Sequence, residues 1–182
     1  KMSLKANTPQ IDTIAFHYAN QTDFTRSKPN TTDFDCEAFI VSKDSIYLFT
    51  KQWTSKKTAL YALPKQPGTY TAQFKSELDT NGLITGATYL EEKKLIALCG
   101  YSKQLKPFLY LLYDFKDNDF FSGNKRKITL ALPYHQVEGI TTKNGLQYYI
   151  TNEHFRLKPI INTPQQLHQL DLSSFLKLYL DN

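Results

Sequence analysis

A pattern of two short apolar runs joined by a polar turn occurs three times along this chain. It limits the possible folds more than any other feature of the sequence. The first copy covers residues 32–51 and begins with a group of carboxylates. Its Glu37 returns 101 residues later as Glu138, and a middle copy, 49 residues after the first, has Gly86 at the matching position. The repeating unit is therefore about 50 residues long.

Each unit predicts four short strands. The apolar runs span only a few residues, are rich in β-branched and aromatic side chains, and are separated by Asp-Ser, Asn-Gly and Pro-Gly turns. Helical repeats would show longer runs with a 3.6-residue period. Units of about 40–50 residues with four strands are typical of β-propeller blades. We therefore expect an all-β fold, a β-propeller, with one short helix over residues 172–180.

The copies predict blades at 33–80, 81–132 and 133–182, with residues 11–18 as the outer strand of a preceding blade. This makes about three and a half four-stranded blades in a single domain over 1–182, whereas propellers close with about four to eight blades. We expect part of a larger, six-bladed propeller. Its missing blades would precede this chain or be supplied by another chain.

Charge and cysteine content exclude several classes of protein. There are 22 Lys and Arg against 17 Asp and Glu, a net charge of +5. The basic residues are dispersed, without an Arg-rich run or an aromatic nucleic-acid motif, so we expect no nucleic-acid partner. Cys36 and Cys99 form neither a disulfide framework nor a metal knuckle, and two free thiols or one disulfide both stay open.

Targeting is not settled by this sequence. No apolar run reaches the roughly 18 residues that a membrane span needs, so no membrane span is expected. The chain begins Lys1-Met2, which is typical of a trimmed chain, so the lack of a signal peptide says nothing about export.

One face of the predicted disc carries the long polar loops. In a four-stranded blade, the connection into the innermost strand and the loop between the second and third strands lie on the same face, and the other face has short turns. We expect a carbohydrate, peptide or protein ligand on this loop-rich face. The residues predicted to contact it are Lys51, Trp53, Tyr134, His135, Glu153 and His154.

Two of these residue types leave alternatives open. Trp53 lies among lysines, and it either stacks on a sugar ring or a peptide or covers the end of the blade core. His135 and His154 are either general bases or metal ligands, or they are simply solvated loop residues.

Glu37 and Glu138 begin innermost strands and are expected to line a central channel, with Asp35 two residues before Glu37. Carboxylates that converge there hold a hard cation such as calcium, act as acid and base, or accept backbone N–H groups and join neighbouring blades. Gly86 interrupts the ring of carboxylates. A metal site of Asp35, Glu37 and Glu138 is therefore an alternative to a structural joint, and no residue is assigned as catalytic because no nucleophile elbow or phosphate loop is present.

A resemblance to a known family rests on the Asp35-x-Glu37-Ala38 segment and its Asp-Ser-Ile-Tyr-Leu-Phe-Thr-Lys continuation at residues 44–51. From about residue 11 onward the chain resembles a group of uncharacterised exported β-propeller proteins of Bacteroidetes-type bacteria. The resemblance implies export and further blades before this chain, without an agreed substrate. More remotely the chain is similar to esterase-like-phytase and gluconolactonase-type propellers, which bind metal through acidic residues at the channel mouth.

The sequence thus predicts an extracytoplasmic β-propeller module, secreted, periplasmic or on the cell surface. Its expected role is to bind a carbohydrate, peptide or protein, or to act as a scaffold, without catalysis. The alternative is a calcium-dependent hydrolase of phosphoesters or lactones, since propellers host many unrelated functions.

Overall fold

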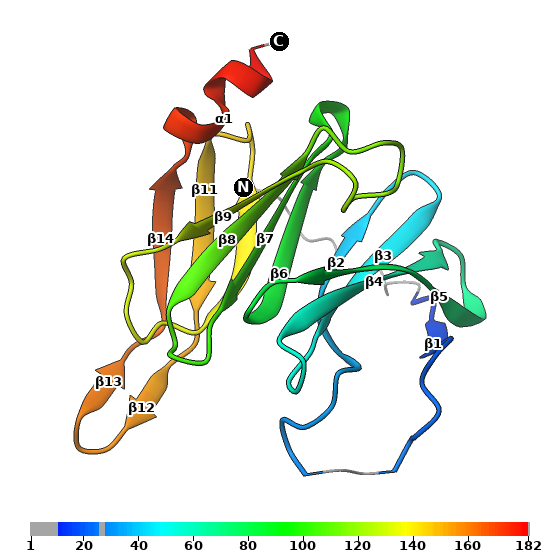
Figure 1. Cartoon of the computed structure of the whole chain (residues 1–182), viewed down its shortest axis with the longest axis horizontal. Helices are drawn as coiled ribbons and strands as arrows, with labels where there is room; N and C mark the ends of the chain where they lie inside the picture. The colour runs from blue at the N-terminus through cyan, green and yellow to red at the C-terminus, as the bar shows by residue number, and fades with distance from the viewer. Residues whose placement is uncertain (1–10, 26–27, 182) are drawn as a thin grey trace.

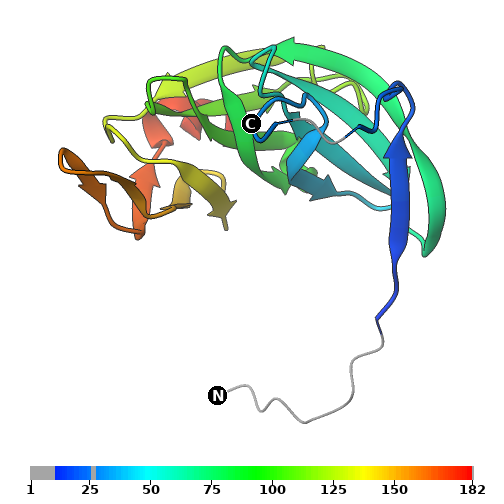
Figure 2. The same ribbon diagram turned by 90° about the horizontal axis from the view of Figure 1, so that it is seen from below.

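The sheets of this protein follow one another in chain order and curl together into an open arch (Figure 2). A computed structural model describes residues 11–25 and 28–181, so residues 1–10, 26–27 and 182 lie outside the described residues. Strands dominate, and a short helix lies near the C-terminal end, which confirms the all-β prediction. In the described ranges, no helix combines the length and the apolar character that crossing a membrane requires.

The first sheet has the strand order β1-β5-β4-β3-β2. Four strands form an antiparallel meander: β2 (Asp35–Val41), β3 (Ser45–Lys51), β4 (Lys57–Pro64) and β5 (Gly68–Asp79). The fifth strand, β1 (Ile14–Tyr18), pairs in parallel with β5. Residues 11–18 were expected in a preceding blade, whereas β1 extends the first sheet.

The length of β5 explains this position of β1. The first part of β5 runs past the end of β4 and leaves a free edge, which β1 takes through pairs from Ile14 with Gly68 to Tyr18 with Ala72. Tyr18 then packs on Tyr61, with 4.6 Å between ring centroids, in a small cluster on one face of the first sheet. β1 therefore helps to bury the face of the first sheet that turns away from the second.

The second sheet is a four-stranded antiparallel meander, β6-β7-β8-β9. Its strands are β6 (Leu83–Leu90), β7 (Leu95–Tyr101), β8 (Pro107–Tyr113) and β9 (Asn124–Thr129). A single 3₁₀ turn, η1 (Glu91–Lys93), joins β6 to β7.

The third sheet has three strands in the order β10-β11-β14. They are β10 (Val137–Thr142), β11 (Gln147–Asn152) and β14 (Gln166–Asp171). The chain then forms α1 (Ser173–Leu180), which confirms the predicted short helix. Leu176 and Leu180 of α1 are buried against this sheet and the second one.

Between β11 and β14 the chain forms a hairpin that the sequence pattern did not predict. Its strands are β12 (Phe155–Leu157) and β13 (Ile161–Thr163), paired only with each other. In Figure 1 this hairpin lies at the same end of the molecule as the connection from β1 to β2, and α1 lies at the opposite end. We call the former the loop-rich end.

The second sheet forms the centre of the core because both of its faces are covered. Every residue of β7 is buried. Side chains such as Ile96 and Leu98 pack with the first sheet, and Leu95, Ala97 and Cys99 pack with the third sheet and α1. Successive strand residues point to opposite faces, so a strand covered on both sides has a continuous apolar sequence.

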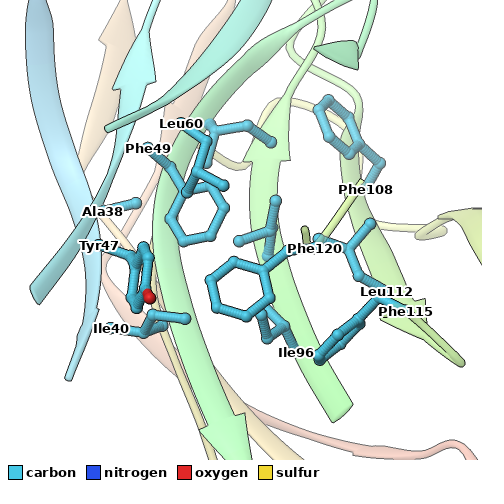
Figure 3. Packing of buried hydrophobic residues seen from close by; sticks show 12 residues of the cluster. Ala38, Ile40, Tyr47, Phe49, Leu60, Ile96, Phe108, Leu112, Phe115 and Phe120 are labelled. Carbon is cyan, nitrogen blue, oxygen red and sulfur yellow. The ribbon is translucent and has the colours of Figure 1, made fainter. Parts of the chain in front are cut away.

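Phe120 fills the junction between the first and second sheets (Figure 3). It comes from the connection between β8 and β9 and is fully buried. Its ring lies 4.8 Å from that of Tyr47 and 5.0 Å from that of Phe115, measured between centroids. One loop residue therefore helps to hold two sheets together.

We predict that Phe120→Ala lowers the free energy of unfolding by about 3–5 kcal/mol, because it removes a buried ring and leaves a cavity. Urea unfolding followed by circular dichroism measures this change. Phe24→Ala is the matched control, since Phe24 is 67% exposed, and it should change stability by less than about 0.5 kcal/mol. Equal effects of the two substitutions would contradict the role of Phe120.

Candidate functional site

The innermost strands of the three sheets lie next to one another, with β6 between β2 and β10. Each has a β-bulge near its start, at Glu37 in β2, Thr85 in β6 and Glu138 in β10. A bulge adds one residue opposite a single partner and re-aims its side chain. The three side chains therefore start from equivalent backbone positions, at the loop-rich end of neighbouring strands.

The spacing of 49 residues predicts Gly86 as the counterpart of Glu37 in the middle copy. In the structure the bulged residue of β6 is Thr85. In β6 the pair of Gly86 with Cys99 lies between the bulge and the following turn, whereas in β2 the matching residue, Glu37, is itself the bulge. The bulge in β6 thus lies one residue further from its turn than the bulge in β2. A constant sequence offset cannot detect such a shift.

Small residues in β6 allow β10 to come close. A Cβ atom added to Gly86 would lie 2.9 Å from the carbonyl oxygen of Glu138, which is closer than real Cβ atoms come. Thr85 is also short, is almost fully buried, and donates its hydroxyl hydrogen to the carbonyl oxygen of Val137. The carboxyl of Glu138 can therefore interact with that of Glu37 across the middle strand.

Lys51, at the end of β3, pairs with Glu37. Its Nζ lies 2.6 Å from Oε2 of Glu37, and the lysine side chain is 4% exposed against 36% for the glutamate. Burial acts to lower the pKa of Lys51, but the hydrogen bond to Glu37 and the surrounding negative charges outweigh it, so the pKa is raised. The lysine stays charged at every physiological pH.

Glu138 completes a charged cluster with Glu37 and Lys51. Burial raises the pKa of Glu138 to about 8, although the cation of Lys51 opposes this shift. The charge of Glu37, a hydrogen bond to Glu37 and the charge of Glu153 raise the pKa further. At neutral pH the carboxyl of Glu138 therefore keeps its proton beside Glu37.

Trp53 covers this cluster from the loop after β3. Its indole Nε1–H donates to Oδ2 of Asp35 at 2.9 Å. Nζ of Lys51 lies 4.7 Å from the centroid of the Trp53 ring and 5.5 Å from that of Tyr101. A cation over an aromatic face is stabilised by the ring quadrupole. The polar edge of Trp53 and its contact with Lys51 are thus engaged within the protein, which favours its role as a cover.

The other residues predicted to contact a ligand make local contacts in the described chain. Tyr134 is 46% exposed. His135 lies edge-on to His168, with 5.2 Å between ring centroids, and Nε2 of His154 lies 2.8 Å from Oδ1 of Asn162. The charge of Glu153 acts on Glu138. The structure brings Lys51, Trp53, Asp35, Glu37 and Glu138 together, and Tyr134, His135 and His154 lie outside this group.

The carboxylates of the predicted calcium site have partners within the protein. In the parts of the chain that the structure describes, no three side chains of His, Cys, Asp or Glu come together as a metal-binding set. Asp35 accepts the indole hydrogen of Trp53, and the ammonium of Lys51 lies beside Glu37. Calcium takes about six to eight oxygen ligands, and it would meet a fixed positive charge at this position.

Two members of the cluster escaped the sequence-based prediction of the site. Tyr101 is 5% exposed, and burial raises the pKa of its hydroxyl. It is the last residue of β7 as Lys51 is the last residue of β3, so the repeat alone could have indicated it. Thr85 could have been found only by allowing the bulge to shift by one residue.

Comparisons with known proteins return no match among protein-family models, curated proteins or solved structures. The functional argument therefore rests on the geometry of the cluster and of the loop-rich end.

The pKa of Glu138 predicts a pH dependence of stability with a definite sign. The carboxyl binds its proton more tightly in the folded chain, where its pKa is about 8, than at its ordinary value of 4.5. Stability should therefore be complete below pH 4.5 and fall as the pH rises towards 8. Because the carboxyl is partly solvated, we expect the free energy of unfolding to fall by about 1–2 kcal/mol over this range. This is well below the change that the full pKa difference would give.

Glu138→Gln should remove this slope, because a neutral amide cannot ionise. Urea unfolding of wild type and variant between pH 5 and pH 9 measures it. Glu92→Gln is the control, since Glu92 lies in an exposed turn and should leave the slope unchanged. An unchanged slope in Glu138→Gln would contradict the assignment.

Proposed function

We propose that this chain forms part of a β-propeller and acts as an extracytoplasmic binding module without catalytic activity. Three features support the propeller. The sheets follow one another in chain order, their innermost strands are neighbours, and each innermost strand bulges at the loop-rich end. Short hairpin connections then order the strands outward within each sheet, as in propeller blades.

The observation that carries the non-catalytic role is that the chemically active groups bind one another. Lys51 pairs with Glu37, the carboxyls of Glu37 and Glu138 interact, and Asp35 accepts the indole hydrogen of Trp53. A general acid or base must reach a substrate atom within hydrogen-bond distance. Groups that are bonded among themselves in this way instead join the first sheet to the third.

The loop-rich end is then the surface available for a ligand. It carries the connection from β1 to β2 and the hairpin between β11 and β14, and loops held by a rigid scaffold are common places for recognition. Aromatic side chains are accessible there, among them the exposed Tyr134 and the partly exposed Phe34. Such surfaces suit carbohydrates, whose rings have an apolar face and hydroxyl edges. We therefore propose a carbohydrate as the ligand.

A glycan array probed with the labelled chain tests this proposal. We expect binding to a restricted group of glycans, with dissociation constants in the micromolar to millimolar range that is typical of small contact areas. Heat-unfolded chain on the same array is the control. Silence of the folded chain across the whole array would count against a carbohydrate ligand.

The effect of calcium on the melting temperature distinguishes the proposed binding module from the alternative, a calcium-dependent hydrolase. A ligand that binds only the folded state stabilises it in proportion to the logarithm of its concentration over its dissociation constant. Because Lys51 occupies the space beside Glu37, we expect about 5 mM calcium chloride to leave the melting temperature within about 1 °C of the value in EDTA. Magnesium chloride at equal ionic strength is the control. A rise of several degrees that is specific for calcium, and is lost in Glu37→Gln, would favour the hydrolase.

A further inference from the structure

A pocket of about 250 Å³ opens on the first sheet at the loop-rich end. It is built from five parts of the chain, namely the turn after β1, the end of the connection into β2, the loop between β3 and β4, strand β4 and strand β5. The residues that line it are Asn20, Asp33, Phe34, Gln52, Ser55, Ala59, Tyr61, Phe74 and Glu77.

Aromatic rings form its apolar walls. Tyr61 of β4 and Phe74 of β5 are direct partners in the strand ladder, and their ring centroids lie 5.7 Å apart at an angle of 73°. Phe74 is 45% exposed, although it is a large apolar residue on a β-strand. Phe34 lines the pocket from the connection before β2. The pocket therefore offers ring surface that the fold leaves in contact with solvent.

Neutral polar groups point to a neutral ligand. Gln52 is only 5% exposed, and its amide is held by the hydroxyl groups of Thr50 and Ser55. The hydroxyl of Tyr61 donates to Oδ1 of Asn20 at 2.7 Å. An amide has two donor hydrogens and two acceptor lone pairs, so both amides have more capacity than these bonds use.

The two carboxylates of the pocket already have partners. Asp33 accepts the backbone N–H groups of Thr54 and Ser55, which fixes the loop between β3 and β4. Glu77 pairs with Lys57 at 2.7 Å. Neither carboxylate needs a cationic ligand to balance its charge, which disfavours an amine in this pocket.

We propose that this pocket binds a single pyranose ring of a glycan, stacked on Phe74 and hydrogen-bonded through Gln52 and Asn20. The proposal rests on the carbohydrate-binding function and names its site. The volume lies below the range of about 300–1,000 Å³ that is usual for larger ligands, so one sugar unit fits and an extended peptide does not. Aromatic stacking with amide hydrogen bonds at the ring edge is the chemistry that recognises such a ring.

Amide chemical shifts of the ¹⁵N-labelled chain, titrated with methyl hexopyranosides of the gluco, galacto and manno series, test the site directly. At least one glycoside should shift the amides of Gln52, Ser55, Tyr61 and Phe74 together. Phe74→Ala should weaken this binding at least tenfold. Phe39→Ala is the matched control, because Phe39 is 58% exposed on β2 outside the pocket, and it should change affinity less than twofold.

Phe74→Trp guards against a folding defect, because it keeps an aromatic surface at this position. It should bind within about threefold of wild type, with an unchanged melting temperature. Glycan binding that Phe74→Ala leaves intact, or shifts confined to another surface, would overturn the pocket and leave the proposed function standing. If no glycoside shifts any amide and no glycan on the array binds the chain, both the sugar site and the carbohydrate-binding function are overturned.

Discussion

The charged cluster of Lys51, Glu37 and Glu138 is the interaction on which the arrangement of the sheets depends. Lys51 is buried and Glu138 is half-buried, and taking such groups out of water is costly unless they are compensated. Lys51 and Glu37 compensate each other as an ion pair, and Glu138 is compensated by holding a proton beside Glu37. Because Glu37 belongs to the first sheet and Glu138 to the third, the compensation requires both sheets to be in place.

Several features of the second sheet follow from this requirement. β6 lies between the two strands that carry the carboxylates, so its residues at the crossing must be small, as Thr85 and Gly86 are. β7 must be apolar on both faces, because sheets pack against it from both sides. The charged cluster and the apolar core thus specify the same arrangement, and such consistency between levels favours one folded state.

The proposed division between scaffold and binding surface has the same origin. The cluster uses groups with acid–base chemistry, beside Trp53. In the proposed binding module, the connections at the loop-rich end then remain available for a ligand. The pocket beside Phe74 lies on the outer part of the first sheet, where β4 and β5 supply its walls.

Much of the strand order could be predicted from the repeat, because apolar runs and turn residues recur at a nearly constant spacing. The helix α1 was also predictable, since Asp171 precedes an apolar run and its carboxylate accepts the N–H of Ser173. The parallel pairing of β1 was not, because it depends on the free edge left by the long β5. The hairpin of β12 and β13 was also missed, since strands of three residues carry no clear periodicity.

The site was predictable in its members but not in its role. Charge or position in the repeat draws attention to Lys51, Trp53, Glu37 and Glu138. Only their contacts in the folded chain distinguish a joint between the first and third sheets from a metal site. Thr85 was missed because a bulge moves by one residue without changing the length of the repeat. The pocket gathers side chains from five parts of the chain, such as Asn20 and Glu77, and no local pattern joins them.

A double-mutant cycle between Glu37→Gln and Glu138→Gln tests most directly whether these two carboxyls join the first sheet to the third. We call this joint the interlock. The free energies of unfolding of wild type, both single variants and the double variant are measured at pH 6 by urea denaturation. A direct interaction between the two carboxyls predicts a coupling energy of at least about 1 kcal/mol. Additive effects, with a coupling energy below about 0.3 kcal/mol, would show that the two residues act independently and would contradict the interlock.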